Sequence, residues 1–242
     1  MILLLGDIHG MYEKLINLTD SFARENQADS YRVVLLGDSG MNFYLDERDR
    51  RIKGLLQEAI DQVKKKRICV DIFFVRGNHE CRPEDIETYR SVNTAYGELL
   101  VEEQFPNLLF FKDGFTYEIE GKHILVIGGG NSSDFFSRML NGEPFWESES
   151  YSLNEEQKIL DSVSKICEKE LIVFSHVLPK ELAIEKKEGI AGRSVEELMS
   201  RIWSCSPSRI LKWYAGHYHM DRKIDYGETV FYIVYNEVIG LE

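Results

Sequence analysis

The sequence has no paired cysteines, little proline and no long apolar runs, and each absence narrows the class of protein. Its 4 cysteines are scattered and form no Cys-x-x-Cys pair, which argues against a structural zinc site and favours reduced thiols. No apolar run reaches the ~18 residues of a membrane-spanning helix, and the apolar start at residues 1–5 is too short for a secretory signal. We therefore expect a folded cytoplasmic protein without a membrane partner.

Basic residues are fewer than acidic residues. The chain has 29 Lys and Arg against 41 Asp and Glu, a formal net charge of −12. Such a surface repels polyanions, which bind through many contacts from Lys and Arg to phosphates. Long nucleic acid is thus an unsuitable partner, whereas a small phosphorylated substrate or a phosphopeptide is compatible with a cleft that bound cations make locally positive. Composition carries no signal for the oligomeric state.

The first 75 residues alternate short apolar runs with segments of helical periodicity. Short runs that end in glycine are typical of buried parallel strands, and we expect them at residues 2–5, 33–36 and 69–75. Residues 12–23 and 46–65 are predicted helices. This order predicts a βαβαβ unit with right-handed connections, within a single domain over residues 1–242.

The period changes in the second half of the chain. Residues 84–104 have a weak pattern, for which we expect part helix and part loop, and short turns with Gly predict antiparallel hairpins among three strands between residues 108 and 127. Two sheets with helices on their outer faces follow from this order. The expected strands cover residues 108–111, 115–119, 123–127, 171–174, 210–214 and 229–235, and the expected helices cover residues 154–168 and 195–202.

Polar side chains follow five of the apolar runs, at the point where each run ends. Strands of one sheet end along one edge, so these side chains can converge in space. Asp7 and Asp38 have an alternative use as helix caps, but five of the six histidines also lie in these pieces, and only His123 lies inside a strand without a motif. The expected cluster is Asp7, His9, Asp38, Asn78, His176, His217 and His219. Imidazole, carboxylate and amide groups together suit divalent Mn, Fe, Co, Ni or Zn.

The five pieces, in this order, resemble the motifs of the calcineurin-like metallophosphoesterase superfamily. They are Gly6-Asp7-Ile8-His9-Gly10, Gly37-Asp38-Ser39-Gly40, Gly77-Asn78-His79-Glu80, Ser175-His176 and Gly216-His217-Tyr218-His219. The resemblance implies an α/β fold, a four-layer α/β/β/α sandwich in which two mixed sheets are flanked by helices. It also implies two divalent metal ions at the sheet ends, with Mn as the expected ion and Fe, Zn, Co or Ni as alternatives.

Roles for single residues follow from the same resemblance. The ligands of one ion would be Asp7, His9 and His219, those of the other Asn78, His176 and His217, and Asp38 would bridge both. A hydroxide between the ions would attack phosphate esters, with phosphomonoesters as the expected substrates, and His79 would be the general acid. A phosphodiesterase or nucleotide hydrolase with the same site, and a non-catalytic metal-binding scaffold, are the alternatives.

Two arginines are candidates for substrate binding. Gly77 to Arg82 is similar to the block of serine/threonine phosphoprotein phosphatases in which an arginine grips phosphate, so Arg82 is one candidate. Those enzymes have an Asp and an Arg where this chain has Met41 and Asn42, so the group that orients the catalytic histidine is missing here. Residues 128–146 resemble the insertion loop of small bacterial and phage relatives, and Arg138 in that loop is a candidate for the replacement phosphate contact.

Overall fold

The first sheet is built around three parallel strands. A computed structural model of the chain describes residues 1–25, 30–65, 69–184 and 194–241, and β1 (Ile2–Leu5), β2 (Ser30–Leu36) and β3 (Cys69–Val75) pair in parallel in it. Helices α1 (Tyr12–Glu25) and α2 (Glu47–Lys65) connect these strands. The predicted βαβαβ order is thus confirmed, since each apolar run is buried on both faces of the sheet.

Four further strands complete this sheet in the order β13-β1-β2-β3-β6-β5-β4. The prediction of helix and loop for residues 84–104 is wrong, because β4 (Tyr89–Thr94) and β5 (Gly97–Glu102) form an antiparallel hairpin there. Most side chains of β4 are exposed at the sheet edge, so this strand lacks the apolar alternation that would identify it. The other two strands are β6 (Leu108–Phe110) and β13 (Ile239–Leu241).

The second sheet has six strands in the order β11-β12-β10-β9-β8-β7. A hairpin joins β7 (Phe115–Ile119) to β8 (Lys122–Ile127), as predicted, and its turn residues Glu120 and Gly121 both have positive φ. The predicted hairpin between β6 and β7 is wrong, because these strands belong to different sheets. The other strands are β9 (Glu170–Ser175), β10 (Arg209–Ala215), β11 (Arg222–Tyr226) and β12 (Thr229–Ile233).

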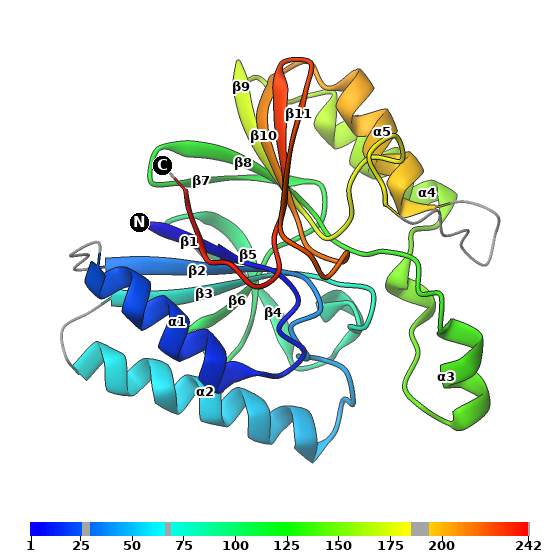
Figure 1. Cartoon of the computed structure of the whole chain (residues 1–242). Helices are drawn as coiled ribbons and strands as arrows, with labels where there is room; N and C mark the ends of the chain where they lie inside the picture. Colours follow the sequence, from blue (N-terminus) through cyan, green and yellow to red (C-terminus); the bar gives the residue numbers. More distant parts are fainter. Residues whose placement is uncertain (26–29, 66–68, 185–193, 242) are drawn as a thin grey trace.

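The two sheets pack face to face, and helices cover their outer sides (Figure 1). Val34 and Phe73 of the first sheet meet Phe174 and Tyr214 of the second in one buried apolar cluster. Helices α1 and α2 cover the first sheet, and α4 (Leu153–Val163) and α5 (Val195–Cys205) cover the second. The predicted four-layer α/β/β/α sandwich is therefore confirmed.

The segment between β8 and α4 lies outside these layers. It contains α3 (Phe135–Asn141), which stands apart from both helix layers at the lower right of Figure 1, and the short helix η2 (Glu147–Glu149). A second short helix, η1 (Pro83–Asp85), follows β3. The segment thus reaches past the end of the sandwich.

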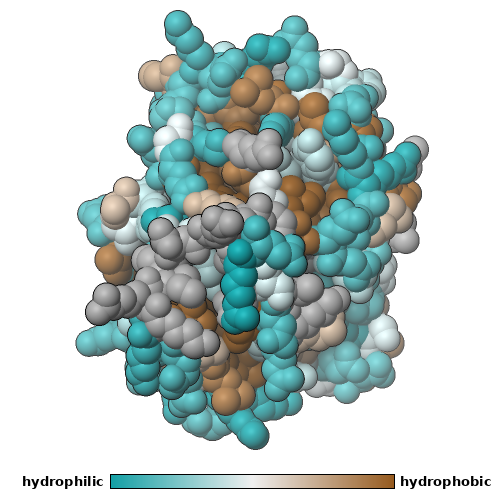
Figure 2. Space-filling model, turned by 60° about the vertical axis from the view of Figure 1, so that its left-hand side comes forward, coloured by the Kyte–Doolittle hydropathy of each residue, from teal (hydrophilic) through white to brown (hydrophobic). Residues whose placement is uncertain are grey.

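The surface agrees with the charge of the sequence. On the face shown in Figure 2, hydrophilic side chains cover much of the surface and separate the hydrophobic patches from one another. None of the helices in the described part of the chain has the length and apolar character needed to cross a membrane.

Candidate metal centre

The seven predicted ligands lie where strands of both sheets end. Asp7 and Asp38 follow β1 and β2, Asn78 follows β3, and His176 and the histidines of residues 217–219 follow β9 and β10. All these strands are parallel within their sheets, so their carboxyl ends share one edge. The structure therefore brings together side chains from distant parts of the sequence.

One group of ligand atoms comes from Asp7, His9 and His219, which lie within 4.8 Å of one another. The Nε2 atoms of the two histidines are 3.2 Å apart, and both rings are exposed. The Oδ1 atom of Asp7 is buried and has no hydrogen-bond partner among the described residues. An unpaired buried carboxylate oxygen is costly, and a cation at this position would satisfy it.

A second group surrounds His176, which is fully buried. Its Nδ1 lies 2.8 Å from the carbonyl oxygen of Leu36. Its Nε2 lies 2.8 Å from Oδ1 of Asn78, 3.2 Å from Nδ1 of His217 and 3.6 Å from Oδ2 of Asp38. If Nδ1 donates its proton to Leu36, Nε2 of the neutral ring carries a lone pair that faces the acceptor oxygens of Asn78 and Asp38, which requires a proton or a metal ion between them.

The two aspartates and His176 shift one another's pKa values. Burial raises the pKa of Asp7 to about 7 against the opposing effect of the His176 charge. Burial disfavours the charged form of His176, but the carboxylates of Asp38 and Asp7 outweigh it and raise the pKa of its ring to about 9. For Asp38, the charges of His176 and His79 outweigh burial and hold its pKa well below the usual range. The carboxylates of the cluster thus favour a proton on His176.

Strained backbone accompanies the ligands. His9, Asp38, His217 and His219 all have positive φ, between 42° and 70°, a region that non-glycine residues seldom occupy. Such conformations persist only where the surroundings enforce them, and they concentrate at functional sites. Gly77 packs tightly against Asp38, because a Cβ at Gly77 would lie 2.0 Å from Oδ1 of Asp38.

Glu80 holds two of the ligand loops together. Its buried carboxylate accepts hydrogen bonds from the backbone N–H of Ser39, at 2.7 Å, and from that of Gly77, also at 2.7 Å. Burial and the nearby Asp38 charge raise the pKa of Glu80 to about 7. Glu80 therefore positions the loops that carry Asp38 and Asn78.

His79 lies beside the cluster with 27% of its side chain exposed. Its backbone N–H donates to Oδ1 of Asp38 over 2.9 Å, and its Nε2 lies 4.0 Å from Oδ2 of the same residue. Among the described residues, no other carboxylate lies within ion-pair distance of its ring. Asp38 thus holds the backbone of His79 and lies near its ring, whereas Met41, at the position of the missing Asp, offers no carboxylate.

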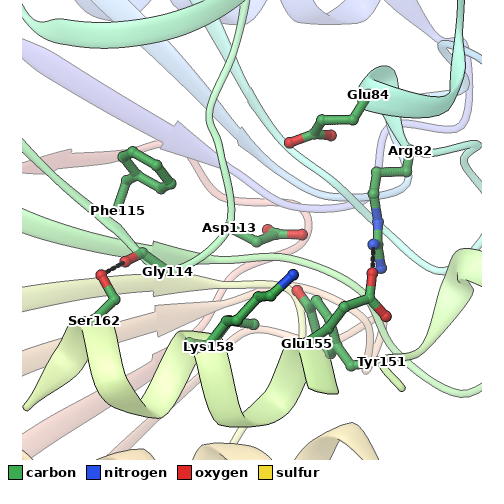
Figure 3. A pocket seen from close by; sticks show the side chains of 10 residues that line it. Arg82, Glu84, Asp113, Gly114, Phe115, Tyr151, Glu155, Lys158 and Ser162 are labelled. Atoms are coloured by element: carbon green, nitrogen blue, oxygen red, sulfur yellow. Dashed lines mark hydrogen bonds and ion pairs between the residues drawn. The ribbon is translucent and has the colours of Figure 1, made fainter. Parts of the chain in front are cut away.

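Arg82 points toward helix α4. Figure 3 shows its guanidinium directed at Glu155, with which it forms a salt bridge, in a pocket that also contains Asp113 and Lys158. Its Nη2 donates to the carbonyl oxygen of Ser150 over 3.2 Å. None of the seven candidate ligands lines this pocket. The role of Arg82 in phosphate binding stays a prediction.

Arg138 of α3 is 2% exposed and surrounded by acceptors. Its Nη2 lies 2.6 Å from Oε1 of Glu149, its Nε 3.2 Å from Oδ1 of Asp134, and its Nη1 donates to the carbonyl oxygen of Pro144 over 3.0 Å. These partners occupy every edge of the guanidinium. Its predicted phosphate contact likewise stays a prediction.

Two residues that sequence reasoning missed support the ligands. Ser132 accepts a hydrogen bond from Nδ2 of Asn78 over 2.7 Å, which directs the amide oxygen toward His176. Tyr235 stacks on the ring of His219 with centroids 4.9 Å apart. Neither lies in a recognisable motif, although the loop after β8 begins with Gly128-Gly129-Gly130, which allows Ser132 to approach. A Cβ at Gly130 would lie 3.3 Å from Asn78.

The donor set fits a pair of divalent cations. Two overlapping groups of ligand atoms share Asp7, one with His9 and His219 and the other with Asp38 and His176. Mixed imidazole, carboxylate and amide donors match first-row transition metals. The unpaired oxygen of Asp7 and the converging acceptors around His176 are the features that bound cations would satisfy.

Comparisons with known proteins agree with this arrangement. The family model described as calcineurin-like phosphoesterase matches residues 1–221. No curated protein sequence matches the chain. Solved structures share its fold at low identity. One is the anchor in the inner membrane complex of Plasmodium, at 12% identity and a TM-score of 0.50, with 97% of this chain and 70% of that chain covered.

Two more solved structures are similar over 97% of this chain. A protein from Staphylococcus aureus described as a 5′-nucleotidase has 13% identity and a TM-score of 0.49, and the match covers 48% of its length. The phosphopantetheinyl hydrolase from Mycobacterium tuberculosis has 10% identity and a TM-score of 0.44, with 89% of that chain covered. This chain therefore spans about half of the first protein and most of the second.

Proposed function

Because the chain belongs to the calcineurin-like phosphoesterase family, we propose that it is a metal-dependent hydrolase that cleaves phosphate monoesters at the centre formed by Asp7, Asp38 and His176. The convergence of ligand atoms around the unpaired Oδ1 of Asp7 and Nε2 of His176 carries this proposal. Without cations, the acceptors that converge in this buried site require a proton on His176. Loss of the centre should therefore abolish hydrolysis.

Each ligand group has a defined role in this proposal. Asp7, His9 and His219 would hold one ion, Asn78, His176 and His217 would hold the other, and Asp38 would contribute to both. Two divalent ions bound here would acidify water into a nucleophile near neutral pH and offset charge on the phosphoryl oxygens. The Leu36 carbonyl fixes the ring of His176 by accepting its Nδ1 proton, a contact that orients a metal ligand and raises its basicity.

His79 supplies the proton that the leaving oxygen needs. In the reaction, oxygen from water bonds to phosphorus, the ester P–O bond breaks, and the His79 ring transfers its proton to the departing oxygen. The exposed position of this ring allows contact with a substrate. Its Nε2 lies 4.0 Å from Oδ2 of Asp38.

Charge supports a monoester as the substrate. Two divalent cations carry more charge than the carboxylates of Asp7 and Asp38 neutralise, and the excess attracts a dianion more strongly than a monoanion. A monoester is largely dianionic near neutral pH, whereas a diester carries a single negative charge. Mn is the proposed ion, and Fe, Zn, Co and Ni are the alternatives that the donor set admits.

A comparison of two chromogenic esters tests the proposal. The protein, stripped of metal and reloaded with Mn, Fe, Zn, Co or Ni in turn, is assayed on p-nitrophenyl phosphate and on bis-p-nitrophenyl phosphate. We expect the monoester to be hydrolysed faster, and only after metal addition. Faster hydrolysis of the diester would show that the protein is a phosphodiesterase and not a monoesterase. Absence of hydrolysis with metals bound would favour a non-catalytic scaffold.

A further inference from the structure

A cavity of about 310 Å³ lies in the segment between β8 and η2, next to the candidate metal centre. This volume is at the lower end of the range for small-molecule sites. Its walls come from the loop after β8, from the start of α3 and from the turn around η2. They include Ser132, Ser133, Phe135, Phe136, Trp146 and Glu149.

The cavity is in direct contact with a candidate metal ligand. The hydroxyl of Ser132, in the cavity wall, accepts a hydrogen bond from Asn78 over 2.7 Å. Gly130, also in the wall, lies so close to Asn78 that an added Cβ would be 3.3 Å from it. The Glu149 carboxyl in the same wall is within electrostatic reach of His79. A group attached to a phosphate at the centre, on the side of His79, therefore has this cavity beside it.

The wall offers flat apolar surfaces with polar groups at their edges. The rings of Phe135 and Phe136 are 5.7 Å apart at an angle of 89°. Phe136 is 63% exposed, so the face of its ring is accessible to a ligand. The Nε1 atom of Trp146 is buried and has no acceptor among the described residues. A ligand with aromatic character and an acceptor would satisfy both features.

The charges of the wall disfavour a second phosphate. Arg138 is buried behind the wall and paired with Glu149, at 2.6 Å, and with Asp134, at 3.2 Å. Glu147 is exposed and adds a negative charge. No lysine or arginine is among the residues that line this cavity. The cavity thus suits an uncharged group.

We propose that this cavity is a leaving-group subsite that takes an uncharged planar aromatic ring with hydrogen-bonding edges, such as a nucleobase. The ring stacks on Phe136 and accepts a hydrogen bond from Nε1 of Trp146, while the phosphate occupies the metal centre. This assignment rests on the proposed function, because it places the ring on the alcohol side of a phosphate ester. It also predicts that a nucleoside monophosphate is preferred over the corresponding triphosphate.

Kinetics on two monoesters test the subsite. Adenosine 5′-monophosphate carries the ring, and glycerol phosphate lacks it. We expect a higher kcat/KM for the first, and we expect Phe136→Ala to lower the ratio of the two values about tenfold, as loss of one stacking contact does. Trp146→Phe, which keeps a ring and removes the donor, should lower the ratio several-fold. Leu140→Ala is the matched control, because Leu140 is on the same helix, 80% exposed, and outside the cavity.

The outcomes separate the subsite from the function. If glycerol phosphate is hydrolysed and the ratio is near one, or is the same in Phe136→Ala as in the Leu140→Ala control, the subsite is wrong and the function stands. If no phosphoester is hydrolysed with metals bound, the proposed function fails. The binding of adenosine then tests the subsite independently of the function.

Binding is measured with adenosine itself, which carries no phosphate. We expect a saturable change in tryptophan fluorescence of the metal-free protein that disappears in Trp146→Phe, since the other two tryptophans, Trp203 and Trp213, are outside the cavity. Phe136→Ala should weaken the binding about tenfold, and Leu140→Ala should not. Absence of a saturable change in the wild type would overturn the subsite.

Discussion

The candidate metal centre and the buried Arg138 site are opposite cases of polar burial. Around His176, a ring nitrogen faces an amide oxygen at 2.8 Å and a second imidazole at 3.2 Å, and Asp7 keeps an unpaired oxygen. Around Arg138, three acceptors meet the three edges of one guanidinium. The first arrangement is incomplete without a ligand, and the second is complete within the protein.

This difference separates residues that are built for a ligand from residues that stabilise the fold. A buried polar group that lacks a partner costs free energy, so it persists where a ligand completes it. A buried ion pair with all its partners present needs nothing further, and removing one member leaves a charge unpaired. Substitutions at the two places should therefore affect different properties.

The largest effect should follow from Asp38→Asn. This change removes the negative charge between the two proposed ions, so we expect kcat/KM for p-nitrophenyl phosphate to fall by about 10³-fold or more, since metal ions supply several kcal/mol of transition-state stabilisation. Metal content measured by mass spectrometry should fall with it. Asp46→Asn, at an exposed Asp outside the cluster, is the control. A variant that keeps its activity without metal would contradict the role of the centre.

A smaller effect on activity should follow from His79→Gln. Loss of the general acid should slow an alkyl phosphate about a hundredfold, because an alkoxide leaves poorly without a proton. Hydrolysis of p-nitrophenyl phosphate, whose leaving group needs no proton, should be slowed much less. Steady-state kinetics on both substrates check this, and equal slowing of the two would remove His79 from the acid role.

The arginine sites should respond in stability. Arg138→Met leaves Glu149 buried beside an apolar chain, so we expect a loss of about 3 kcal/mol in the free energy of unfolding. Arg82→Gln removes the ion pair with Glu155, whose side chain is 36% exposed. The free energy of unfolding should therefore fall by less than about 1 kcal/mol. Urea denaturation measures both. A fall of more than tenfold in kcat/KM for Arg82→Gln, with unchanged stability, would instead show that Arg82 leaves Glu155 to bind substrate.

The smallest effect is a pH dependence confined to the metal-free protein. Asp7 and His176 have pKa values near 7 and 9 in the fold, both raised, so the folded state binds protons that the unfolded state has released. Stability should therefore fall as pH rises from about 4 to 9. The lowered pKa of Asp38 acts only in more acidic solution. Melting temperatures with chelator should show this fall, and added Mn should reduce it, because metal binding favours the proton-free ligands. A melting temperature that rises over this range would oppose the assigned protonation of the cluster.

Sequence patterns predicted the positions of ligands better than the partners of long side chains. Asp7, Asp38 and Asn78 follow strands directly, so the sheet edge determines where their short side chains lie. The guanidinium of Arg82 is several rotatable bonds from its backbone, and its partner Glu155 is on a helix far away in sequence. No local pattern could identify that pairing. Residues 89–94 were missed as a strand for another reason, since an exposed edge strand is specified by its neighbour's hydrogen bonds.

Supporting contacts were missed where they depend on the folded arrangement of loops. The stacking of Tyr235 on His219 joins the end of β12 to the loop after β10. The contact between Ser132 and Asn78 joins the loops after β8 and β3. Both contacts cross between segments that carry no shared motif, so only the assembled sandwich reveals them.

Anomalous diffraction from crystals of the Mn-loaded protein would locate the metal ions. We expect two strong peaks about 3.5–4 Å apart, with Asp38 between them, one beside His9 and His219 and the other beside Asn78, His176 and His217. A single peak, or peaks away from Asp7 and His176, would contradict the proposed metal centre.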